Sequence, residues 1–497
     1  MLFLTASMIK EAEKRTLENV SSMTLIENAA YALFNELKSF SSVRIYCGKG
    51  NNGSDGYATA ILLKKSGIQT EIVQVAPPQT DECRFLYQKA LQEDIRIIDE
   101  VDFPQENFEC ILDAVLGIGI TGDVIDPPIR KAIGIINTSG SFVVSADIPS
   151  GMNTDTGKEC GIAVRADKTV TFTAPKLGML SNSSVDLCGE IKVAEVGIGV
   201  NYTEFSESTC VPITPKLIKA MLPKRSRYSH KGTFGTTVIV AGSSTMPGAA
   251  VMAAMAAVRS GCGLVKVIVP VSICRVLNIL VKEAIVIPVP EQNGIMLPDL
   301  TPEAFAAIKE ADSVLVGCGL GKGNHHILIN NILSNASCGV IVDADGINSL
   351  HENMGTIRNK NVLITPHPKE FSRISGYEVK EIESNRITLS DSFARENGIN
   401  LLLKGARSII TYGGSNRYVS IESTSALAKA GSGDILAGLI AGIASQGLVL
   451  TDSAATACLI HTHTGIIAEK EIGAFGATAD DLISFIPRAI KQIQNYI

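Results

Sequence analysis

The segment with the clearest chemistry is Lys429-Ala430-Gly431-Ser432-Gly433-Asp434, which precedes a charge-free apolar run over 435–450. Small residues leave the backbone N–H groups of 431–433 accessible at an expected helix start, where these donors and the helix dipole attract anions such as phosphate. Asp434 can then accept a proton from a substrate hydroxyl while the N–H groups stabilise a transferring phosphoryl group. The segment therefore indicates kinase-like chemistry, although a plain loop with an aspartate at a helix start would use the same residues.

Six apolar runs in the second half predict the strands that position this segment. Most of them lead into glycine or polar residues, as parallel strands do where they enter loops. Helical patterns separate several of the runs, so we expect an α/β sheet with its ligand site at the carboxyl ends of the strands. The predicted strands are 236–241, 264–269, 313–316, 340–343, 362–365 and 400–403.

The first half begins with helical periodicity over 8–37, followed by a strand over 43–46, a glycine-rich turn over 48–56 and a helix over 57–65. A strand, a glycine turn and a helix in this order are typical of the start of a doubly wound α/β unit. We therefore predict a second α/β domain at this end of the chain.

The glycine turn matches the dinucleotide pattern G-x-G-x-x-G through Gly48, Gly50 and Gly53. That pattern also requires an acidic residue at the end of the next strand, and the predicted strand over 71–76 ends without one. The turn therefore does not predict an ordinary Rossmann dehydrogenase.

Polar side chains follow successive strands of this first domain. Asn52 lies on the glycine turn, Asp113 ends another predicted strand, and Asp147 and Ser150 follow the strand over 142–146. Because the carboxyl ends of parallel strands share one edge of a sheet, we expect these four side chains to converge on one crevice. Each alone could be a turn former, but several on successive strand ends favour a site.

The composition limits the partners and the compartment. Of 497 residues, 45% are hydrophobic and 19% are charged; the net charge of −6, with no long Lys or Arg run, argues against nucleic acid or an anionic membrane and favours a small-molecule partner. Eleven cysteines without a C-x-x-C pair indicate reduced thiols in a cytoplasmic protein. The sequence shows no export signal, and its longest charge-free apolar run is shorter than the roughly 18 residues of a membrane helix.

The length predicts at least two domains. Between 201 and 223 the periodic pattern gives way to polar residues and scattered prolines, so we expect domains at 1–210 and 211–497. The first is predicted to be a Rossmann-like three-layer α/β/α domain.

The histidines do not indicate a metal site. His461 and His463 lie two apart on a predicted helix and make a poor metal pair, and His325 and His326 are predicted to lie in a solvated loop.

Six motifs in the second half, taken in order, resemble those of the ADP- or ATP-dependent NAD(P)H-hydrate dehydratases of the ribokinase-like superfamily. The resemblance runs from residue 215 to the end and implies a ribokinase-like α/β fold. The motifs are Ser229-His230-Lys231-Gly232, Ala241-Gly242-Ser243 with Met246-Pro247-Gly248-Ala249, Asp343-Ala344-Asp345, Thr365-Pro366-His367-Pro368 with Glu370, Lys404-Gly405 and Gly431-Ser432-Gly433-Asp434.

The first half resembles the NAD(P)H-hydrate epimerase domain. Together the two resemblances cover nearly the whole chain and correspond to a fused, bifunctional nicotinamide-nucleotide repair enzyme. The motifs of the first half are Asn51-Asn52-Gly53-Ser54-Asp55-Gly56, Asp113-Ala114 with Gly117, Gly119 and Gly122, and Asp147-Ile148-Pro149-Ser150-Gly151.

The resemblance implies a substrate and two reactions. The substrate is reduced nicotinamide dinucleotide that carries water at C6 as R and S epimers. The first domain would interconvert the epimers, and the second would phosphorylate the C6 hydroxyl of the S form and eliminate phosphate. ADP would be the usual donor, giving AMP and phosphate, with ATP as the alternative, and the protein would be a homo-oligomer.

The resemblance also assigns roles to residues. Asp147 and Asp434 would be the catalytic acid or base of the two sites, and Mg²⁺ would accompany the nucleotide. K⁺ would be bound by the oxygens of Asn52, Asp113 and Ser150. The first site would hold the hydrate through Asn51, Asn52, Gly53, Ser54, Asp55, Gly117, Ile118, Gly119, Ile120, Thr121, Gly122, Asp123 and Asp147. The second would hold it through Ala249, Gly319, His367 and Asp434, and the nucleotide through Lys404, Gly405, Ala406, Arg407, Ser408, Gly431, Ser432 and Gly433.

Two positions depart from the family pattern. Ser54 stands where a second glycine is usual, which requires a negative φ at that residue, and Cys318 stands where proline is usual. Two other functions use similar motifs: a ribokinase-like kinase of a small alcohol such as hydroxymethylpyrimidine or hydroxyethylthiazole, and a first domain that serves only as a binding module. A stable phosphorylated product would indicate the kinase, and hydrate binding without epimerisation would indicate the binding module.

Overall fold

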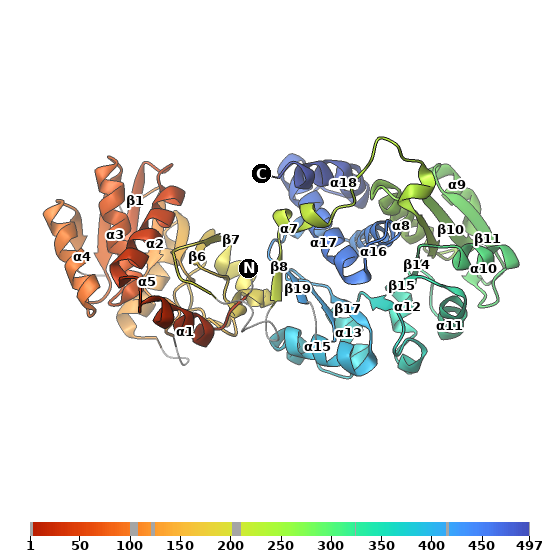
Figure 1. The fold of residues 1–497 in the computed structure, drawn as a ribbon, viewed down its shortest axis with the longest axis horizontal. Coiled ribbons are helices and arrows are strands. Elements are labelled where there is room, and N and C mark those ends of the chain that lie inside the picture. The colour runs from red at the N-terminus through yellow and green to blue at the C-terminus, as the bar shows by residue number, and fades with distance from the viewer. Residues whose placement is uncertain are drawn as a thin grey trace. The chain divides into compact units, whose positions relative to one another are not determined.

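The computed structural model describes residues 3–99, 108–120, 125–200, 210–323, 325–413 and 417–496. The chain divides into two compact units, Met1–Thr209 and Cys210–Ile497 (Figure 1). Each unit is an α/β structure built on its own sheet. The α/β class predicted for both halves is confirmed.

Among the described residues, the sheet of the N-terminal unit has seven strands in the order β3-β2-β1-β4-β5-β6-β7, all parallel. The strand order reverses at β1 and β4, and the carboxyl edge of such a switch point is where doubly wound sheets bind ligands. The strands are β1 (Ser42–Cys47), β2 (Gln69–Gln74), β3 (Arg96–Ile98), β4 (Cys110–Ala114), β5 (Phe142–Ala146), β6 (Lys168–Phe172) and β7 (Glu190–Ala194).

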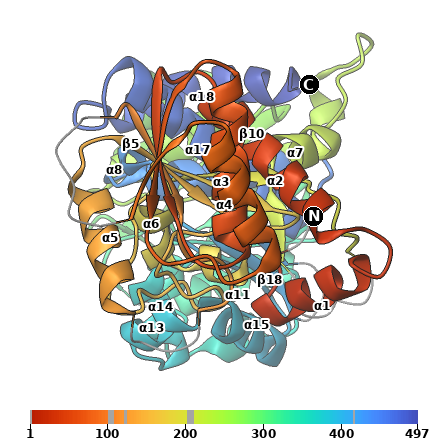
Figure 2. The same ribbon diagram turned by 90° about the vertical axis from the view of Figure 1, so that its left-hand side faces the viewer.

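Helices cover both faces of this sheet, which confirms the three-layer arrangement. The helices α2, α3 and α4 pack their apolar side chains on one face, and α5 packs on the other (Figure 2). The helix bounds are α1 (Ala6–Thr16), α2 (Ser22–Leu37), α3 (Asn51–Lys65), α4 (Asp81–Gln92) and α5 (Pro127–Thr138).

The glycine turn predicted over 48–56 is shorter than expected, because α3 begins at Asn51 and not at 57. The glycines inside α3 allow close packing instead of forming a turn. A Cβ on Gly53 would lie 2.1 Å from the carbonyl oxygen of Gly48, and one on Gly56 would lie 2.8 Å from Sγ of Cys47. Ser54 lies within α3 and is not among the residues with positive φ, so the serine fits this position.

The described part of the C-terminal unit has a ten-stranded sheet in the order β11-β10-β9-β14-β15-β16-β17-β18-β19-β8. It is parallel from β11 to β17, β18 is antiparallel to both neighbours, and β8 is parallel to β19. The six strands predicted here are confirmed within one residue at each end. The strands are β8 (Cys210–Ile213), β9 (Thr236–Val240), β10 (Leu264–Pro270), β11 (Ile285–Val289), β14 (Ser313–Val316), β15 (Gly339–Val342), β16 (Val362–Ile364), β17 (Asn400–Leu403), β18 (Ile409–Tyr412) and β19 (Arg417–Ser420), with a separate hairpin of β12 (Glu291–Gln292) and β13 (Ile295–Met296).

The break in the periodic pattern over 201–223 is not a break in regular structure where this segment is described. It contains β8 and the helix α7 (Pro215–Met221), and β8 adds an edge strand beside β19. A four-residue strand with Pro212 at a sheet edge carries almost no periodic signal, which is why the sequence pattern missed it.

Two layers of helices enclose this second sheet. Small residues let α8 and α16 approach closely, since a Cβ on Gly438 would lie 2.1 Å from the carbonyl oxygen of Ala253. One face carries α7, α8 (Pro247–Arg259), α9 (Cys274–Leu280), α16 (Ser432–Ala444), α17 (Leu450–Glu471) and α18 (Ala479–Gln494). The other carries α10 (Pro302–Lys309), α11 (His326–Asn335), α12 (Asp345–Asn348), α13 (Pro368–Ser375), α14 (Val379–Ser384) and α15 (Arg386–Asn397).

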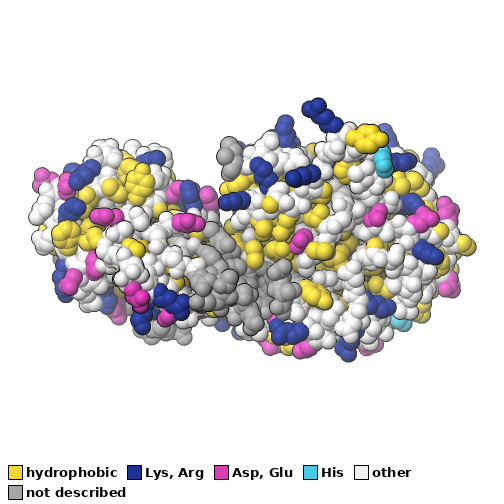
Figure 3. All heavy atoms as spheres, viewed as in Figure 1, with side chains coloured by type: hydrophobic (Ala, Val, Ile, Leu, Met, Phe, Trp, Pro, Cys, Tyr) yellow, Lys and Arg dark blue, Asp and Glu magenta, His cyan; other side chains and the backbone are white. Residues whose placement is uncertain are grey.

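Other expectations from the sequence have clear outcomes. The eleven cysteines form no disulfide among the described residues, in agreement with the reduced thiols predicted. In the part of the chain that the structure describes, no helix is both long and apolar enough to cross a bilayer. Both basic and acidic side chains lie on the face of each unit that Figure 3 shows.

The prediction that His325 lies in a solvated loop is wrong. The His325 ring is buried, and its Nε2 lies 3.0 Å from the carbonyl oxygen of Gly321.

Candidate active sites

A cavity of about 440 Å³ opens at the carboxyl edge of the N-terminal sheet. Most residues predicted to hold substrate in the first domain line it. Thr121, Gly122 and Asp123 lie outside the described residues. Gly53 and Ser54 lie behind the cavity wall, because Gly53 packs on Gly48 and the Ser54 hydroxyl is directed at the carbonyl oxygen of Gly50. The predicted residues on the wall are Asn51, Asn52, Asp55, Gly117, Ile118, Gly119, Ile120 and Asp147.

Asp147 is held at this cavity in an uncommon backbone conformation. Its φ is +70°, a left-handed value that few residues other than glycine adopt, and such strain is often found at functional sites. Its Oδ1 accepts hydrogen bonds from the ammonium of Lys176 and from the backbone N–H of Phe172 at 3.0 Å. One carboxylate oxygen is therefore fixed by the protein on the side of the β6 strand end.

Lys176 is a site residue that the sequence analysis missed. Its side chain is fully buried, lines the cavity, and also donates to the Thr171 hydroxyl at 2.8 Å and the Phe172 carbonyl at 3.0 Å. Burial lowers the pKa of Lys176, and the charge of Asp147 opposes this change. The sequence signal for it is a charged residue four positions beyond the end of β6, and a lone lysine after a strand does not by itself indicate a site.

Of the three residues predicted to bind K⁺, Asp113 and Ser150 are in direct contact. Oδ1 of Asp113 accepts from the Ser150 hydroxyl at 2.6 Å, and Oδ2 accepts from the Ser150 N–H at 2.9 Å and from Ser145 at 2.8 Å. Asn52 donates to the Ala146 carbonyl, while its buried Oδ1 has no hydrogen-bond partner among the described residues. The cluster thus holds a carboxylate, a hydroxyl and an amide oxygen left without a donor.

The predicted anion site of the C-terminal unit is a helix N-terminus. Gly431 precedes α16 with a φ of +88°, and a Cβ there would lie 2.3 Å from Sδ of Met252, so only glycine fits. The Ser432 hydroxyl pairs with the buried Nε2 of His461 at 3.1 Å. Burial lowers the pKa of His461 to about 4, and the ring is neutral at pH 7. His461 therefore supports the turn before α16, while His463 pairs with Glu422, which confirms that the two histidines face different partners.

Asp434 lies in the first turn of α16 beside a second carboxylate. Ligand atoms of Cys318, Asp343 and Asp434 lie within 4.8 Å of one another, and Nζ of Lys404 lies 2.8 Å from Oδ1 of Asp343. The Thr365 hydroxyl also donates to that oxygen at 2.6 Å. Burial, reinforced by the charge of Asp343, raises the pKa of Asp434 to about 7. A carboxylate tuned in this way is suited to proton transfer near neutral pH.

The residues predicted to touch the hydrate in this unit lie around the same strand ends. Gly319, with a φ of +63°, packs against Ala249, and a Cβ there would lie 2.7 Å from the Ala249 Cβ. His367 caps α13 through Nδ1, which accepts the N–H groups of Lys369 and Glu370 at 3.1 and 3.2 Å. Nδ1 therefore carries no proton, and Nε2 is the ring atom that can donate to a ligand.

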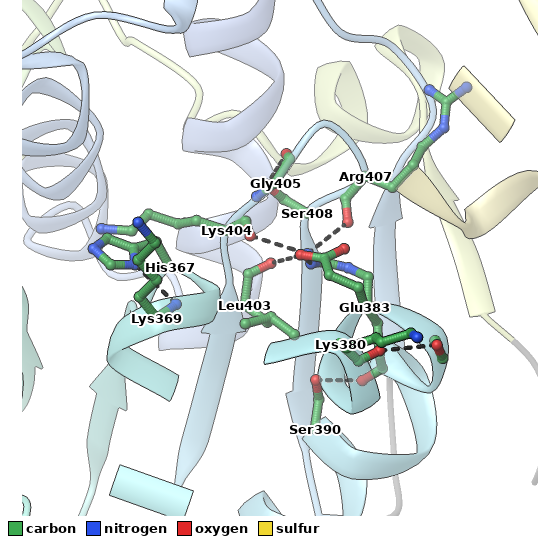
Figure 4. Close-up of polar contacts among 12 residues, drawn as sticks. His367, Lys369, Lys380, Glu383, Ser390, Leu403, Lys404, Gly405, Arg407 and Ser408 are labelled. Atoms are coloured by element: carbon green, nitrogen blue, oxygen red, sulfur yellow. Dashed lines mark hydrogen bonds and ion pairs between the residues drawn. The ribbon is translucent and has the colours of Figure 1, made fainter. Parts of the chain in front are cut away.

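The loop over 404–408 forms a tight turn after β17. The Ser408 hydroxyl lies 3.3 Å from the Gly405 N–H and 3.0 Å from the Gly405 carbonyl oxygen. Arg407 does not point with Lys404 and His367: Figure 4 shows its guanidinium extending away from them, where it donates to the Ile421 carbonyl. The exposed backbone of Gly405 and Ala406, and not the Arg407 side chain, is what this loop offers a ligand.

Arg386 fixes this loop and was also missed. Its Nη2 donates to the carbonyl oxygens of Leu403, Lys404 and Arg407 at 3.2, 3.0 and 3.3 Å. Figure 4 draws these bonds as the dashed lines that begin at the three labelled residues. Its Nη1 pairs with Glu383 at 3.2 Å. The sequence gives no local signal for Arg386, which lies 18 residues before the Lys404-Gly405 motif. Only the packing of α15 on the sheet brings Arg386 to the loop.

Both units therefore have the architecture of ligand-binding α/β enzymes, the second with the glycine-rich helix start and carboxylate of a kinase-like site. Comparison with known proteins agrees. The family described as NAD(P)H-hydrate dehydratase matches residues 237–488, and the family described as YjeF-related protein N-terminus matches residues 22–178.

Full-length relatives match along the whole chain. A bifunctional NAD(P)H-hydrate repair enzyme from Dictyoglomus turgidum is 32% identical over 99% of both chains. The one from Escherichia coli is 30% identical over 90% of this chain and 84% of its own. A solved ribokinase-like superfamily protein from Enterococcus faecalis aligns with a TM-score of 0.51 and 24% identity over 57% of this chain and 96% of its own, which shows the fold alone. The chain belongs to the bifunctional NAD(P)H-hydrate repair enzyme family.

Proposed function

We propose that the unit 1–210 epimerises NAD(P)H hydrates and that the unit 211–497 dehydrates the S epimer at the expense of an adenine nucleotide. Family membership supports repair over the two alternatives, a small-alcohol kinase and an inert binding module. The observation that carries the second half is the juxtaposition of Asp434, Asp343 and Lys404 at the N-terminus of α16.

In the second site, Asp434 takes the proton of the C6 hydroxyl as that oxygen attacks the donor phosphorus. The N–H groups of 431–433 and the Lys404 ammonium stabilise the charge that develops on the phosphoryl oxygens. The C6–O bond then breaks as the N1 lone pair forms an N1=C6 double bond, and loss of a C5 proton restores the dihydropyridine. Phosphoryl transfer thus converts a poor leaving group, hydroxide, into phosphate.

The nucleotide binds along the loop over 404–408 and the turn over 431–433. The backbone at Gly405 and Ala406 and the N–H groups before α16 are the groups that face a phosphate chain. Mg²⁺ would bind with the nucleotide and would supply positive charge beside its phosphates. ADP and ATP both fit this description, and the family resemblance favours ADP as donor with AMP and phosphate as products.

In the first site, Asp147 is the acid or base and the 440 Å³ cavity holds the hydrated ring. K⁺ fits the cluster of Asn52, Asp113 and Ser150, because all three offer hard oxygen atoms and the buried Asn52 Oδ1 has no donor among the described residues. The ion would supply a positive charge that draws substrate oxygens to the cavity wall. Asp113 and Ser150 hold each other and the turn after β5 in place beside it.

The assembly and the compartment complete the proposal. The partner is a small nucleotide, the expected assembly is a homo-oligomer, and the eleven cysteines, which form no disulfide among the described residues, suit the reducing cytoplasm.

The test gives purified protein a mixture of R and S NADH hydrates with Mg²⁺ and ADP, and then ATP, and follows recovery of the NADH absorbance. Full recovery supports both activities, and the faster nucleotide identifies the donor. Recovery that stops at the S fraction would mean an inert first domain. No recovery with either nucleotide, together with phosphorylation of a small alcohol, would overturn the proposal.

A further inference from the structure

We propose that Asp55 is a second proton-transferring residue of the epimerase site and works opposite Asp147. This inference rests on the proposed epimerisation and deepens it. Asp55 is so far only a substrate-binding residue by resemblance, and Asp147 alone cannot account for the chemistry, since inverting C6 requires that a hydroxyl leave from one face and return to the other.

The two carboxyls line one cavity but have opposite surroundings. Asp147 is fixed through Oδ1, which accepts hydrogen bonds from the Lys176 ammonium and the Phe172 N–H. Asp55 is buried, 8% exposed, and its carboxyl has no hydrogen-bond or ion-pair partner among the described residues. Buried carboxyls without a partner disfavour ionisation. Pairs of carboxyls with opposed surroundings are how enzymes assign one proton donor and one acceptor.

The charges around Asp55 act in the same direction. Burial raises the pKa of Asp55 well above its usual range, and the negative charges of Asp147 and Glu13 raise it further. Both effects favour the protonated form of Asp55 in the free site. The ionisable groups around it are Glu13 and Lys10 on α1, Lys49 after β1, Asp147 after β5 and Lys176 after β6, with the thiols of Cys47 and Cys83 behind it.

The step balances without any co-reactant. Asp55 gives its proton to the C6 hydroxyl, the C6–O bond breaks as the N1 lone pair forms N1=C6, and water leaves. A water molecule then adds to the opposite face of C6, Asp147 takes one of its protons, and the electron pair returns to N1. Cavity water returns the proton from Asp147 to Asp55, and the reverse reaction uses the two carboxyls in the opposite order.

The experiment uses the full chain with Asp434→Asn, so that hydrate is not consumed, and follows R-to-S conversion chromatographically against pH. Asp55→Asn should lower the epimerisation kcat by about 100-fold or more, leave the KM for hydrate within a few-fold of its starting value, and remove the alkaline limb of the pH profile. The charge-matched control is Asp81→Asn on α4, because the Asp81 side chain is 96% exposed. This control should change neither the kinetic constants nor the pH profile.

Two further measurements keep the proposal falsifiable if Asp55→Asn does not fold. The Asp434→Asn chain alone must show a bell-shaped profile, and in ¹⁸O water each conversion must introduce one ¹⁸O at C6. A profile without an alkaline limb, retention of the original oxygen, or an Asp55→Asn chain within threefold of its parent would overturn the role of Asp55. Failure of the parent chain to epimerise would instead overturn the proposed function of the unit.

Discussion

Nζ of Lys404 lies 2.8 Å from Oδ1 of Asp343, and this pair joins the ends of β17 and β15 below the N-terminus of α16. Burial opposes the charge of Lys404, but the carboxylates of Asp343 and Glu370 outweigh it and raise the pKa of Lys404. The residue is therefore a cation throughout the physiological pH range. A fixed positive charge beside a glycine-rich helix start is the combination that a transferring phosphoryl group requires.

Replacing Lys404 should affect both stability and nucleotide binding. Lys404→Met leaves the Asp343 carboxylate, whose side chain is only 2% exposed, without its cation, and this should cost about 3 kcal/mol of unfolding free energy. ADP affinity should fall at the same time. Urea unfolding and calorimetric titration with ADP measure the two effects. Lys404→Arg, which keeps the charge, should recover most of the stability, and equal losses in both variants would contradict the electrostatic explanation.

Dehydration should depend on Asp434 and on pH in a defined direction. Asp434 acts as a base only when ionised, and its pKa is about 7, so the rate should fall about tenfold per unit as pH drops below that value. Above about pH 8 the rate should level off. Asp434→Asn should lower kcat by about 100-fold or more with nucleotide binding kept. Stopped-flow NADH recovery at saturating Mg²⁺ checks both, and a rate that rises toward acid pH would exclude this role.

Cys318 should set the midpoint of that profile. Its thiol is fully buried, donates to Oδ2 of Asp343 at 3.8 Å and lies within 4.8 Å of the Asp434 carboxylate. The thiol lowers the pKa of Asp434, against the larger effect of burial. Cys318→Ala removes the donor at little change in volume, so the acid limb should move to higher pH while the plateau rate stays close to that of the parent. The same pH series on Cys262→Ala, a thiol on the loop before β10, serves as the control. A Cys318→Ala profile that superimposes on the parent would show that the thiol only fills space.

Replacing Asp147 should abolish epimerisation and leave dehydration intact. Asparagine is the appropriate substitute, because it tolerates the φ of +70° at this position, whereas alanine would add backbone strain to the loss of the carboxylate. Asp147→Asn should leave the rate of S-hydrate dehydration unchanged and stop R-hydrate recovery at the spontaneous rate. Assays on the separated epimers distinguish the two. Loss of both activities would indicate that the variant is misfolded or that the sites are coupled.

The sequence predicted the parts of each site that follow from local pattern. Strand ends and the helix start after Gly431 follow from alternation and turn chemistry, and the structure confirms them. The expected convergence of Asn52, Asp113, Asp147 and Ser150 rests on the same reasoning, and the structure shows the contact between Asp113 and Ser150. Lys176 could not be recognised in this way, because its partner, Asp147, is 29 residues away in the chain and is brought to it only by strand pairing.

The directions in which the side chains point could not be predicted from the sequence either. The loop motif drew attention to Arg407 as a nucleotide ligand, yet its guanidinium turns toward Ile421. Ser54 and Gly53 belong to a motif on the cavity side of α3, but helical geometry turns them toward the sheet and the preceding turn. A motif therefore locates a site within a few residues, and the helical phase decides which of its members reach the ligand.

Arg386 should act on nucleotide binding through the backbone of the loop. One Nη2 atom holds the carbonyls of Leu403, Lys404 and Arg407, and a Cβ on Gly405 would lie 2.7 Å from it, so the loop is shaped around this guanidinium. Arg386→Lys keeps the charge but cannot reach three carbonyls from one planar group. We expect the KM for ADP to rise about tenfold, with a smaller change in kcat and no change in the KM for hydrate.

The matched control for this variant is Arg395→Lys on the same helix, whose side chain is 62% exposed and pairs with Asp391. It should leave all three constants unchanged. Steady-state kinetics with ADP and hydrate varied separately measure the constants, and thermal melting shows whether Arg386→Lys is folded at the assay temperature. A parallel rise in both KM values would mean that Arg386 supports the whole unit, while a rise confined to ADP means that it shapes the nucleotide loop.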